Sequence, residues 1–436
     1  MSDDDHTAVL PTPGTPDGAP KIDLSRRDLT VDFVRVVCVL LVVVIHLLSV
    51  GIGRSASGAL VVSRTLELQP WFAGATWAGQ IMPLFFVVGG FASLTAWRRM
   101  RPRGVTAGEF VRGRVLRLAL PTLPVFVFFA VAIGIALLVG VSPAFLQTIT
   151  TGAGSPLWFV AAYVLVQSLV PVMAGWHERA PKATLGILLL AAIAVDVAQY
   201  GSHIQILGCL NLSFVWLFAQ QIGFWYADGW FARRRWWQLV IIAAACYCLL
   251  VPLTTFGPYS NNMLNDLNPP TIPLVVLAVA QASVLQLLKP ALAALMRTRG
   301  AQAFVFVVGS RLMTVYLWHL TIIIALSGIA LLIPGATPEP SSAAWWWSRP
   351  LFYVLVLALL YALSFAVGRF ERPRETGETP RDAVVALGVV LTFIPTFIVL
   401  EWFLDFDDAV FGAVCLAIVA LLLSRGPRAK KALPVE

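Results

Sequence analysis

The chain is 436 residues long, 58% of its residues are hydrophobic and only 12% are charged. A soluble globular protein carries about 25% charged residues, so the composition excludes that class and predicts a polytopic membrane protein. The formal net charge is +8, but the basic residues are distributed as membrane topology requires, so we expect no nucleic-acid partner. The five cysteines show no metal-ligand spacing, and we expect no bound metal.

Apolar stretches near 20 residues long mark the predicted membrane spans. Residues 1–24 are rich in Asp, Pro, Gly and Thr and are predicted to be a disordered cytoplasmic tail. Twelve spans are predicted after it, at residues 31–50, 72–96, 121–141, 157–175, 183–200, 208–227, 237–253, 271–288, 310–332, 350–368, 383–402 and 408–424. The connections are short, so we expect no soluble domain.

Basic residues gather in alternate connections between these spans. The connections after the second, fourth, sixth, eighth and tenth spans are basic, whereas only Arg54, Arg64 and Arg349 lie in the opposite ones. Loops rich in Lys and Arg stay in the cytoplasm, so we expect both termini there, with Arg35 at the inner surface and His46 toward the outer one. Arginine far exceeds lysine, which is typical of a GC-rich bacterial genome, so the bacterial inner membrane is the expected location.

The first span carries three ionisable residues, Asp32, Arg35 and His46. At about 100° per residue, the spacing from Arg35 to His46 is about three full turns, so both project from one helix face, roughly 16 Å apart. Asp32 is close enough to pair with Arg35. Ionisable groups at membrane depth indicate function, although an arginine can also snorkel and a histidine can bond a neighbouring helix.

The second and third spans carry two further patterns. Pro83 is expected to kink the second span, and Gly89 and Gly90 permit close helix approach or a break. Arg114 and Arg117 lie on one face of a helix predicted to start near Thr106. These arginines either contact anionic lipid headgroups or form a fork that binds phosphate oxygens.

The fourth and ninth spans also contain candidate site residues. Trp158 lies at the outer boundary of the fourth span, where an interfacial tryptophan is common. In the ninth span, Arg311 and His319 fall on one stripe with Tyr316 beside it, which puts a second histidine at membrane depth.

Taken in order, these residues resemble the acyltransferase family 3 membrane proteins, which O-acylate sugars of surface polysaccharides, peptidoglycan, lipids or secondary metabolites. The resemblance covers about residues 29–370. Its motifs are D-x-x-R with a later His (Asp32, Arg35, His46), P-x-F-F-x-x-S-G-F (Pro83, Phe85, Phe86, Gly89, Gly90, Phe91), R-x-x-R (Arg114, Arg117), L-W-F/Y (Leu157, Trp158, Phe159) and Y-L-x-H (Tyr316, Leu317, Trp318, His319). The chain departs from the pattern at Gly89, where the family usually has serine.

The resemblance implies an all-α polytopic membrane protein with a ten-helix acyltransferase domain at residues 25–370. A cytoplasmic loop at 371–382, two additional transmembrane helices at 383–424 and a basic cytoplasmic tail at 425–436 are expected to follow. Beyond membrane lipids, the implied partners are acyl-CoA, carrying an acetyl or other short acyl group, and a glycan or glycolipid acceptor.

The resemblance and the spacing together suggest roles for the candidate residues. His46 is expected to be the general base on the acceptor hydroxyl or to carry the acyl group itself, with His319 orienting the acceptor or serving as a second transfer site. The expected acyl-CoA phosphate ligands are Arg114, Arg117, Arg112 and Arg98, with Arg35 at the same mouth. The residues expected to orient these groups or line a pore are Asp32, Phe86, Gly90, Trp158, Tyr316 and Arg311.

Two other classes of function remain open at this level. A secondary transporter or flippase also needs buried ionisable residues and broken helices, and it predicts substrate flux without acyl-CoA. A non-catalytic membrane sensor or assembly protein predicts that loss of His46 has no effect.

Overall fold

The computed structural model describes residues 28–55, 57–371 and 379–424. The predicted tails at 1–24 and 425–436, and most of the predicted loop at 371–382, lie outside the described residues. The elements are α1 (Leu29–Ser49), β1 (Val50–Arg54), β2 (Leu60–Arg64), α2 (Phe72–Gly79), α3 (Met82–Met100), α4 (Ala107–Leu138), α5 (Pro143–Gly154), α6 (Leu157–Ser168), α7 (Val170–Arg179), α8 (Pro181–Ser202), α9 (Asn211–Ala227), α10 (Trp236–Thr255), α11 (Ile272–Leu295), α12 (Arg299–Gly309), α13 (Leu312–Ala330), α14 (Ala343–Val367), α15 (Asp382–Trp402) and α16 (Phe406–Ser424), with short 3-10 turns at Arg101–Arg103, Gln205–Leu210 and Gly368–Phe370.

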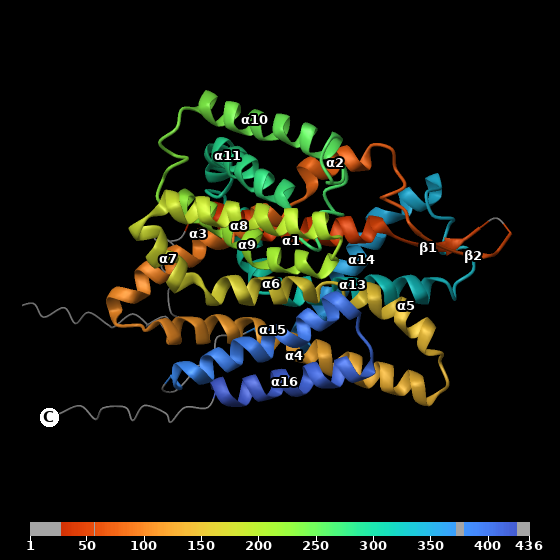
Figure 1. The fold of residues 1–436 in the computed structure, drawn as a ribbon. Helices are drawn as coiled ribbons and strands as arrows, with labels where there is room; N and C mark the ends of the chain where they lie inside the picture. The colour runs from red at the N-terminus through yellow and green to blue at the C-terminus, as the bar shows by residue number, and fades with distance from the viewer. Residues whose placement is uncertain (1–27, 56, 372–378, 425–436) are drawn as a thin grey trace, which may run out of the picture.

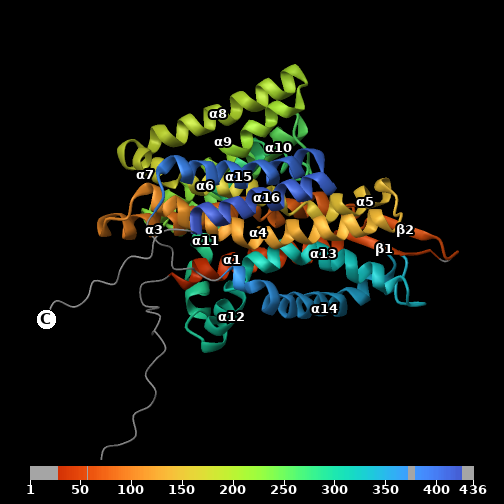
Figure 2. The same cartoon turned by 90° about the horizontal axis from the view of Figure 1, so that it is seen from below.

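The prediction of an all-α polytopic membrane protein is confirmed. Among the described residues, eleven helices are long and apolar enough to cross a membrane. The pair α5 and α6, bent by 42° at its junction, makes a twelfth if it forms one span. Most of the long helices run side by side along one common direction (Figures 1 and 2), as a bundle of spans requires.

The two ends of the bundle differ in chemistry. At one end Lys289 in α11 donates to Asp28 before α1 (3.0 Å), and Arg112 in α4 donates to the Leu423 carbonyl in α16 (2.7 Å). We call this the basic end. The antiparallel hairpin of β1 and β2 projects from the opposite end (Figure 1), which we call the hairpin end. The sequence predicts only a connection between the first two spans here.

The second span differs from its prediction in the position of the break. The helix is interrupted at Gln80 and Ile81, between α2 and α3. Pro83 falls in the first turn of α3, where its missing N–H has no helical partner to lose, so it does not kink the helix. Gly90 instead allows close approach to α9, because a Cβ there would lie 2.3 Å from the Gln220 carbonyl oxygen.

The third and fourth spans also differ from expectation. The helix expected near Thr106 does start there, capped by the Thr106 hydroxyl, but it continues without a break as α4 to Leu138. The fourth span at 157–175 is wrong as a single helix: α6 ends at Ser168 and α7 begins at Val170, with Pro171 in its first turn. A proline favours such a start because it cannot continue the preceding hydrogen-bond pattern.

The two C-terminal helices pack directly against the rest of the bundle. Phe126 of α4 lies against Gly412 of α16, where an added Cβ would come within 2.3 Å of its ring. Phe406 contacts Gly134 of α4, and Leu404 contacts Gly154 of α5. The pair therefore continues the core instead of standing apart from it.

Candidate active site

Two histidines from distant parts of the chain meet inside the bundle. Nε2 of His319 on α13 lies 3.3 Å from Nδ1 of His46 on α1, and the ring centroids are 4.9 Å apart. Nδ1 of His46 also contacts the Val42 carbonyl oxygen (2.9 Å), and Nδ1 of His319 contacts the Tyr316 carbonyl oxygen (2.6 Å). The spacing-based expectation that both histidines lie at membrane depth is consistent with this pair.

These contacts assign the tautomers of the neutral rings. A carbonyl oxygen only accepts, so Nδ1 of each histidine carries the proton that it donates. Nε2 of His319 is then an acceptor for the His46 Nδ1–H. The lone pair of His46 is left on Nε2, which makes no hydrogen bond within the described part of the chain. The arrangement therefore leaves one basic nitrogen of the pair available to a ligand.

His46 lines a large cavity toward the hairpin end. Its volume is about 990 Å³, and its walls include Trp158 and Tyr316 as well as His46. This volume lies at the upper end of the range of pockets that hold a small-molecule ligand, about 300–1,000 Å³. We call it the large cavity.

A second cavity, of about 50 Å³, lies on the basic side of the first. Arg35 and Tyr163 line it, and Val42, Met82 and Tyr316 line both cavities. We call it the small cavity. Arg35 and His46 thus line adjoining cavities that share Val42, as expected for residues that project from one face of α1.

Three arginines gather beside the small cavity. The Arg35 guanidinium lies 5.9 Å from the Phe85 ring, and its Nε is buried with no hydrogen-bond partner in the described residues. Arg114 lies 4.7 Å from the Phe110 ring and interacts electrostatically with Arg117, Arg35 and Tyr163. Arg117, one turn further along α4, is exposed. We call Arg35, Arg114 and Arg117 the arginine cluster.

The side chains of Arg112 and Arg98 contact other helices and not the arginine cluster. Arg112 is 2% exposed and binds the last turn of α16 through the Leu423 carbonyl. Arg98 donates to Asp228 (2.5 Å) and to Glu178 (3.5 Å). Both arginines therefore fasten helices to one another in this structure, and neither joins the arginine cluster.

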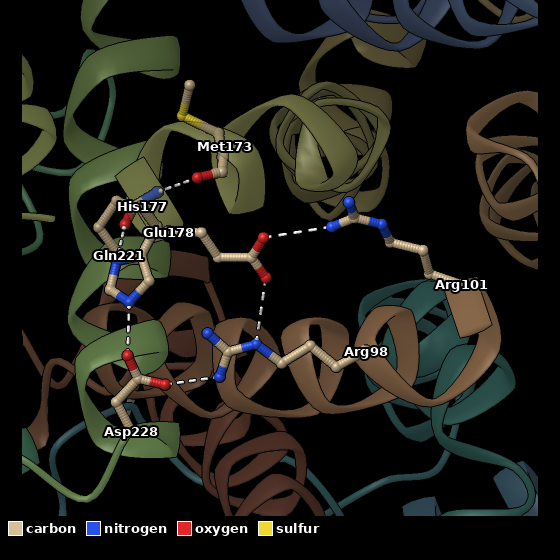
Figure 3. A network of polar contacts seen from close by, with 7 residues as sticks. All are labelled: Arg98, Arg101, Met173, His177, Glu178, Gln221 and Asp228. Atoms are coloured by element: carbon tan, nitrogen blue, oxygen red, sulfur yellow. Dashed lines mark hydrogen bonds and ion pairs between the residues drawn. The ribbon is translucent and has the colours of Figure 1, made fainter. Parts of the chain in front are cut away.

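Arg98 belongs to a polar network that also holds His177 (Figure 3). The two ring nitrogens of His177, which no sequence motif singles out, lie 2.9 Å from Gln221 Oε1 and 2.9 Å from Asp228 Oδ2. Gln221 in turn donates to the Met173 carbonyl oxygen. Burial by itself raises the pKa of Asp228, but the hydrogen bonds from Arg98 and His177 outweigh it and lower the pKa below its usual value. The network ties α3, α7 and α9 together at the basic end.

The other predicted site residues are divided between cavity walls and packing contacts. Trp158 and Tyr316 line the large cavity. Phe86 is buried and stacks on Trp216, at 4.3 Å between ring centroids, and Gly90 packs against α9. Arg311 donates to the Ser364 carbonyl oxygen (2.5 Å) and so fastens α13 to α14.

Asp32 lies in the first turn of α1, one turn before Arg35. The described residues contain no group of three or more His, Cys, Asp and Glu side chains that converge on a metal position.

The sequence motifs missed several residues that line the cavities. Tyr163 lies beside Arg35 in the small cavity and stacks on Phe159, at 4.9 Å between ring centroids. The sequence could have indicated Tyr163, because Tyr163 follows the motif residue Phe159 by one helical turn and lies on the same helix face. Met82 and Val42 carry no chemical signal, since an apolar wall residue looks like any other core residue.

Comparisons with known proteins agree with this architecture. No curated protein and no solved structure matches the chain. The family model described as an acyltransferase domain matches residues 28–369, which run from the cap of α1 to the 3-10 turn after α14 and leave out α15 and α16. A match over this length shows that the chain belongs to acyltransferase family 3.

Proposed function

We propose that the protein is an O-acyltransferase of the bacterial inner membrane. It moves a short acyl group, such as acetyl, from cytoplasmic acyl-CoA to a hydroxyl of a cell-envelope glycan, glycolipid or related acceptor. Membership of the family supports acyl transfer. The observation that carries the finer proposal is the free Nε2 of His46, held at the wall of the large cavity by the contacts of Nδ1 with Val42 and His319.

In this proposal the basic end faces the cytoplasm and the hairpin end faces outward. The basic connections support this orientation, because Lys and Arg are retained on the cytoplasmic side. This orientation puts both termini in the cytoplasm. The donor then approaches the arginine cluster from the cytoplasm, and the acceptor approaches the large cavity from the outer side.

The arginine cluster fits the phosphates of a coenzyme A thioester. The positive charges of Arg117 and Arg35 both act against the Arg114 guanidinium, and phosphate oxygens would relieve that repulsion. The buried Nε of Arg35 lacks a hydrogen-bond partner among the described residues, so it has a donor to offer. Acyl-CoA supplies the activated acyl carbonyl at a thioester. Arg35, Arg114 and Arg117 bind its phosphates, because guanidinium forks match phosphate oxygens in pairs.

His46 is the general base of the transfer. Nε2 takes the proton of the acceptor hydroxyl as the hydroxyl oxygen bonds to the acyl carbon and the carbon–sulfur bond breaks. His46 then returns the proton to the leaving thiolate, so the ring ends neutral. His319 accepts from Nδ1 and holds the imidazole in the tautomer that leaves Nε2 basic. Histidine suits this work because its usual pKa lies near neutral pH.

A purified sample in lipid nanodiscs tests the proposal. Labelled acetyl-CoA is supplied with a glycan or glycolipid acceptor, and free CoA and labelled product are measured. We expect His46→Ala to lower the rate by about 10²–10⁴-fold, while His203→Ala, which removes an exposed histidine at the end of α8, leaves it unchanged. A correctly inserted His46→Ala protein that transfers at the wild-type rate overturns the proposal. Substrate flux in proteoliposomes without acyl-CoA would favour a transporter instead.

A further inference from the structure

We propose that the large cavity binds an amphiphile, with its apolar body between α4, α5 and α13 and its hydroxyl headgroup at His46. The inference rests on the proposed function and narrows its acceptor to a lipid-anchored or lipid-like molecule. A free, fully hydrated polysaccharide segment is excluded as the occupant of this cavity.

The cavity walls are largely apolar on one side. Phe128 and Ile133 of α4, Phe145 of α5 and Ile324 of α13 line that side. Sugar hydroxyls placed against such a wall lose their hydrogen bonds to water without gaining others, which is costly. A hydrocarbon body loses nothing there and releases ordered water, so it is the favoured occupant.

The same side is open where the bilayer lies. Phe128 is 41% exposed and Phe145 56% exposed, and the small residues Ala325 and Gly328 of α13 are exposed as well. Because α4 and α13 are long enough to span the membrane, their exposed apolar residues contact lipid. The exposed wall residues on these two helices therefore give a molecule dissolved in the bilayer a sideways entry to the cavity.

Charged and hydroxyl side chains of the wall lie at the hairpin end, beside the apolar Leu60 and Val62. Ser63, Arg64 and Glu67 line this end of the cavity, and Arg64 pairs with Glu67 (3.4 Å) at the rim. Ser49, one turn after His46, lines the cavity too. An apolar wall facing lipid and a polar rim at the membrane surface match the two halves of an amphiphile.

The competing occupant is a long acyl chain of the donor. To reach the large cavity from the arginine cluster, the chain would have to pass the small cavity, whose volume is about 50 Å³. The pantetheine arm of acyl-CoA has to pass there as well, so the passage does not decide the occupant. A long acyl chain has no polar group to offer Ser63, Arg64 and Glu67 in the cavity wall, whereas an amphiphile has, so we assign the large cavity to the acceptor.

Photolabelling tests the assignment without requiring turnover. The probe is dodecyl glucoside with a diazirine in its alkyl chain, added to the full-length protein in nanodiscs, and labelled residues are located by mass spectrometry. We expect labels on the cavity-facing residues of α4, α5 and α13. Unlabelled dodecyl glucoside should compete for them, whereas methyl glucoside, which has the same sugar and no chain, should not.

Two substitutions fill the cavity on its apolar side. Gly328→Leu introduces a side chain where a Cβ meets nothing within 4 Å, so the fold tolerates it, and Ala325→Leu lies one turn earlier. The double variant should reduce cavity labelling by at least about tenfold. Gly186→Leu on α8, where a Cβ also meets nothing within 4 Å, is the matched control and should not change it.

The outcomes separate this inference from the proposed function. His46→Ala should keep cavity labelling and lose acetyl transfer, because binding does not require the base. If acetyl transfer does not depend on His46 but labelling still depends on the cavity, the proposed function fails and the binding site remains. The amphiphile site is overturned if the cavity-filling variants leave the labelling unchanged. It is also overturned if octanoyl-CoA displaces the label and unlabelled dodecyl glucoside does not.

Discussion

Nε2 of His319 lies 3.3 Å from Nδ1 of His46, and this contact joins α13 to α1 at the wall of the large cavity. The two rings are not equivalent. Among the described residues Nε2 of His46 has no hydrogen-bond partner, whereas both nitrogens of His319 contact protein atoms. His319 is thus a positioning residue for His46, and its loss should act only through His46.

We predict that His319→Ala lowers kcat by about 10–100-fold with little change in the KM for either substrate. His319→Gln should recover part of the loss, because its amide oxygen can accept from His46 Nδ1. In a double-mutant cycle, His46→Ala with His319→Ala should be no slower than His46→Ala alone. Independent losses that multiply in the double variant would show that His319 has chemistry of its own.

The arginine cluster makes a prediction about donor binding. Arg114→Lys keeps the positive charge but loses the planar fork, and we expect it to raise the KM for acetyl-CoA by about tenfold. Acetyl-pantetheine carries the thioester without phosphates, so the same variant should use it as well as the wild type does. A defect of equal size with both donors would contradict phosphate binding by Arg114.

Sequence spacing was sufficient for the site wherever the relevant residues share one helix. Arg35 and His46 lie on α1, and Arg114 and Arg117 on α4, so helical periodicity alone fixes their faces. The partners of Arg98 and Arg112 lie on other helices, at Asp228 and at Leu423. Nothing local to an arginine distinguishes one that reaches a ligand from one that binds a distant helix.

Contacts with residues distant in sequence also explain why the sequence did not predict some elements of the fold. The hairpin of β1 and β2 docks onto the loop before α14, where Arg54 N–H donates to the Thr337 carbonyl oxygen (3.2 Å). The strands are stabilised by a segment far away in sequence, and no local pattern in this connection indicates that contact. Hydropathy found the spans because lipid imposes the same requirement on every one of them.

The network around His177 makes a stability prediction. Asp228→Ala removes the shared acceptor of Arg98 and His177 and leaves a buried imidazole N–H without its partner. We expect a loss of about 1–3 kcal/mol in stability, measured by thermal unfolding in detergent, with no rise in the KM for acetyl-CoA. Glu178→Ala removes an exposed acceptor of Arg98 that leaves the His177–Asp228 contact in place, and it should cost less than about 1 kcal/mol. A raised KM in Asp228→Ala would instead link the network to donor binding.

Close packing of α3 on α9 makes Gly90 a sensitive position. Gly90→Ala would bring a Cβ within 2.3 Å of the Gln220 carbonyl oxygen, which is backbone and cannot rotate away. We expect a loss of about 1–3 kcal/mol from the forced separation of the two helices. Gly175→Ala on α7, where a Cβ meets nothing within 4 Å, should be neutral or stabilising by up to about 1 kcal/mol. Equal melting temperatures for the two variants would show that α3 and α9 are not held at this distance.

Asp266, in the loop between α10 and α11, gives the protein a predictable pH dependence. Burial raises the pKa of its carboxyl group to about 6, and the nearby charge of Asp196 adds to the effect. A carboxyl group whose pKa is higher in the folded chain than in the unfolded chain binds its proton more tightly when folded. Its contribution to stability is therefore present at low pH and is lost as the pH rises from about 4 to above 6.

Asp266→Asn carries no charge at any pH and can still accept from Thr271. We expect it to melt at a higher temperature than the wild type at pH 7.5 and to remove the decline in melting temperature between pH 4 and 6.5, each pKa unit being worth about 1.4 kcal/mol. Glu339→Gln, which neutralises an exposed acid in another loop, should leave the wild-type curve in place. A lower melting temperature for Asp266→Asn at pH 7.5 would mean that the ionised carboxylate is the form that the folded loop requires.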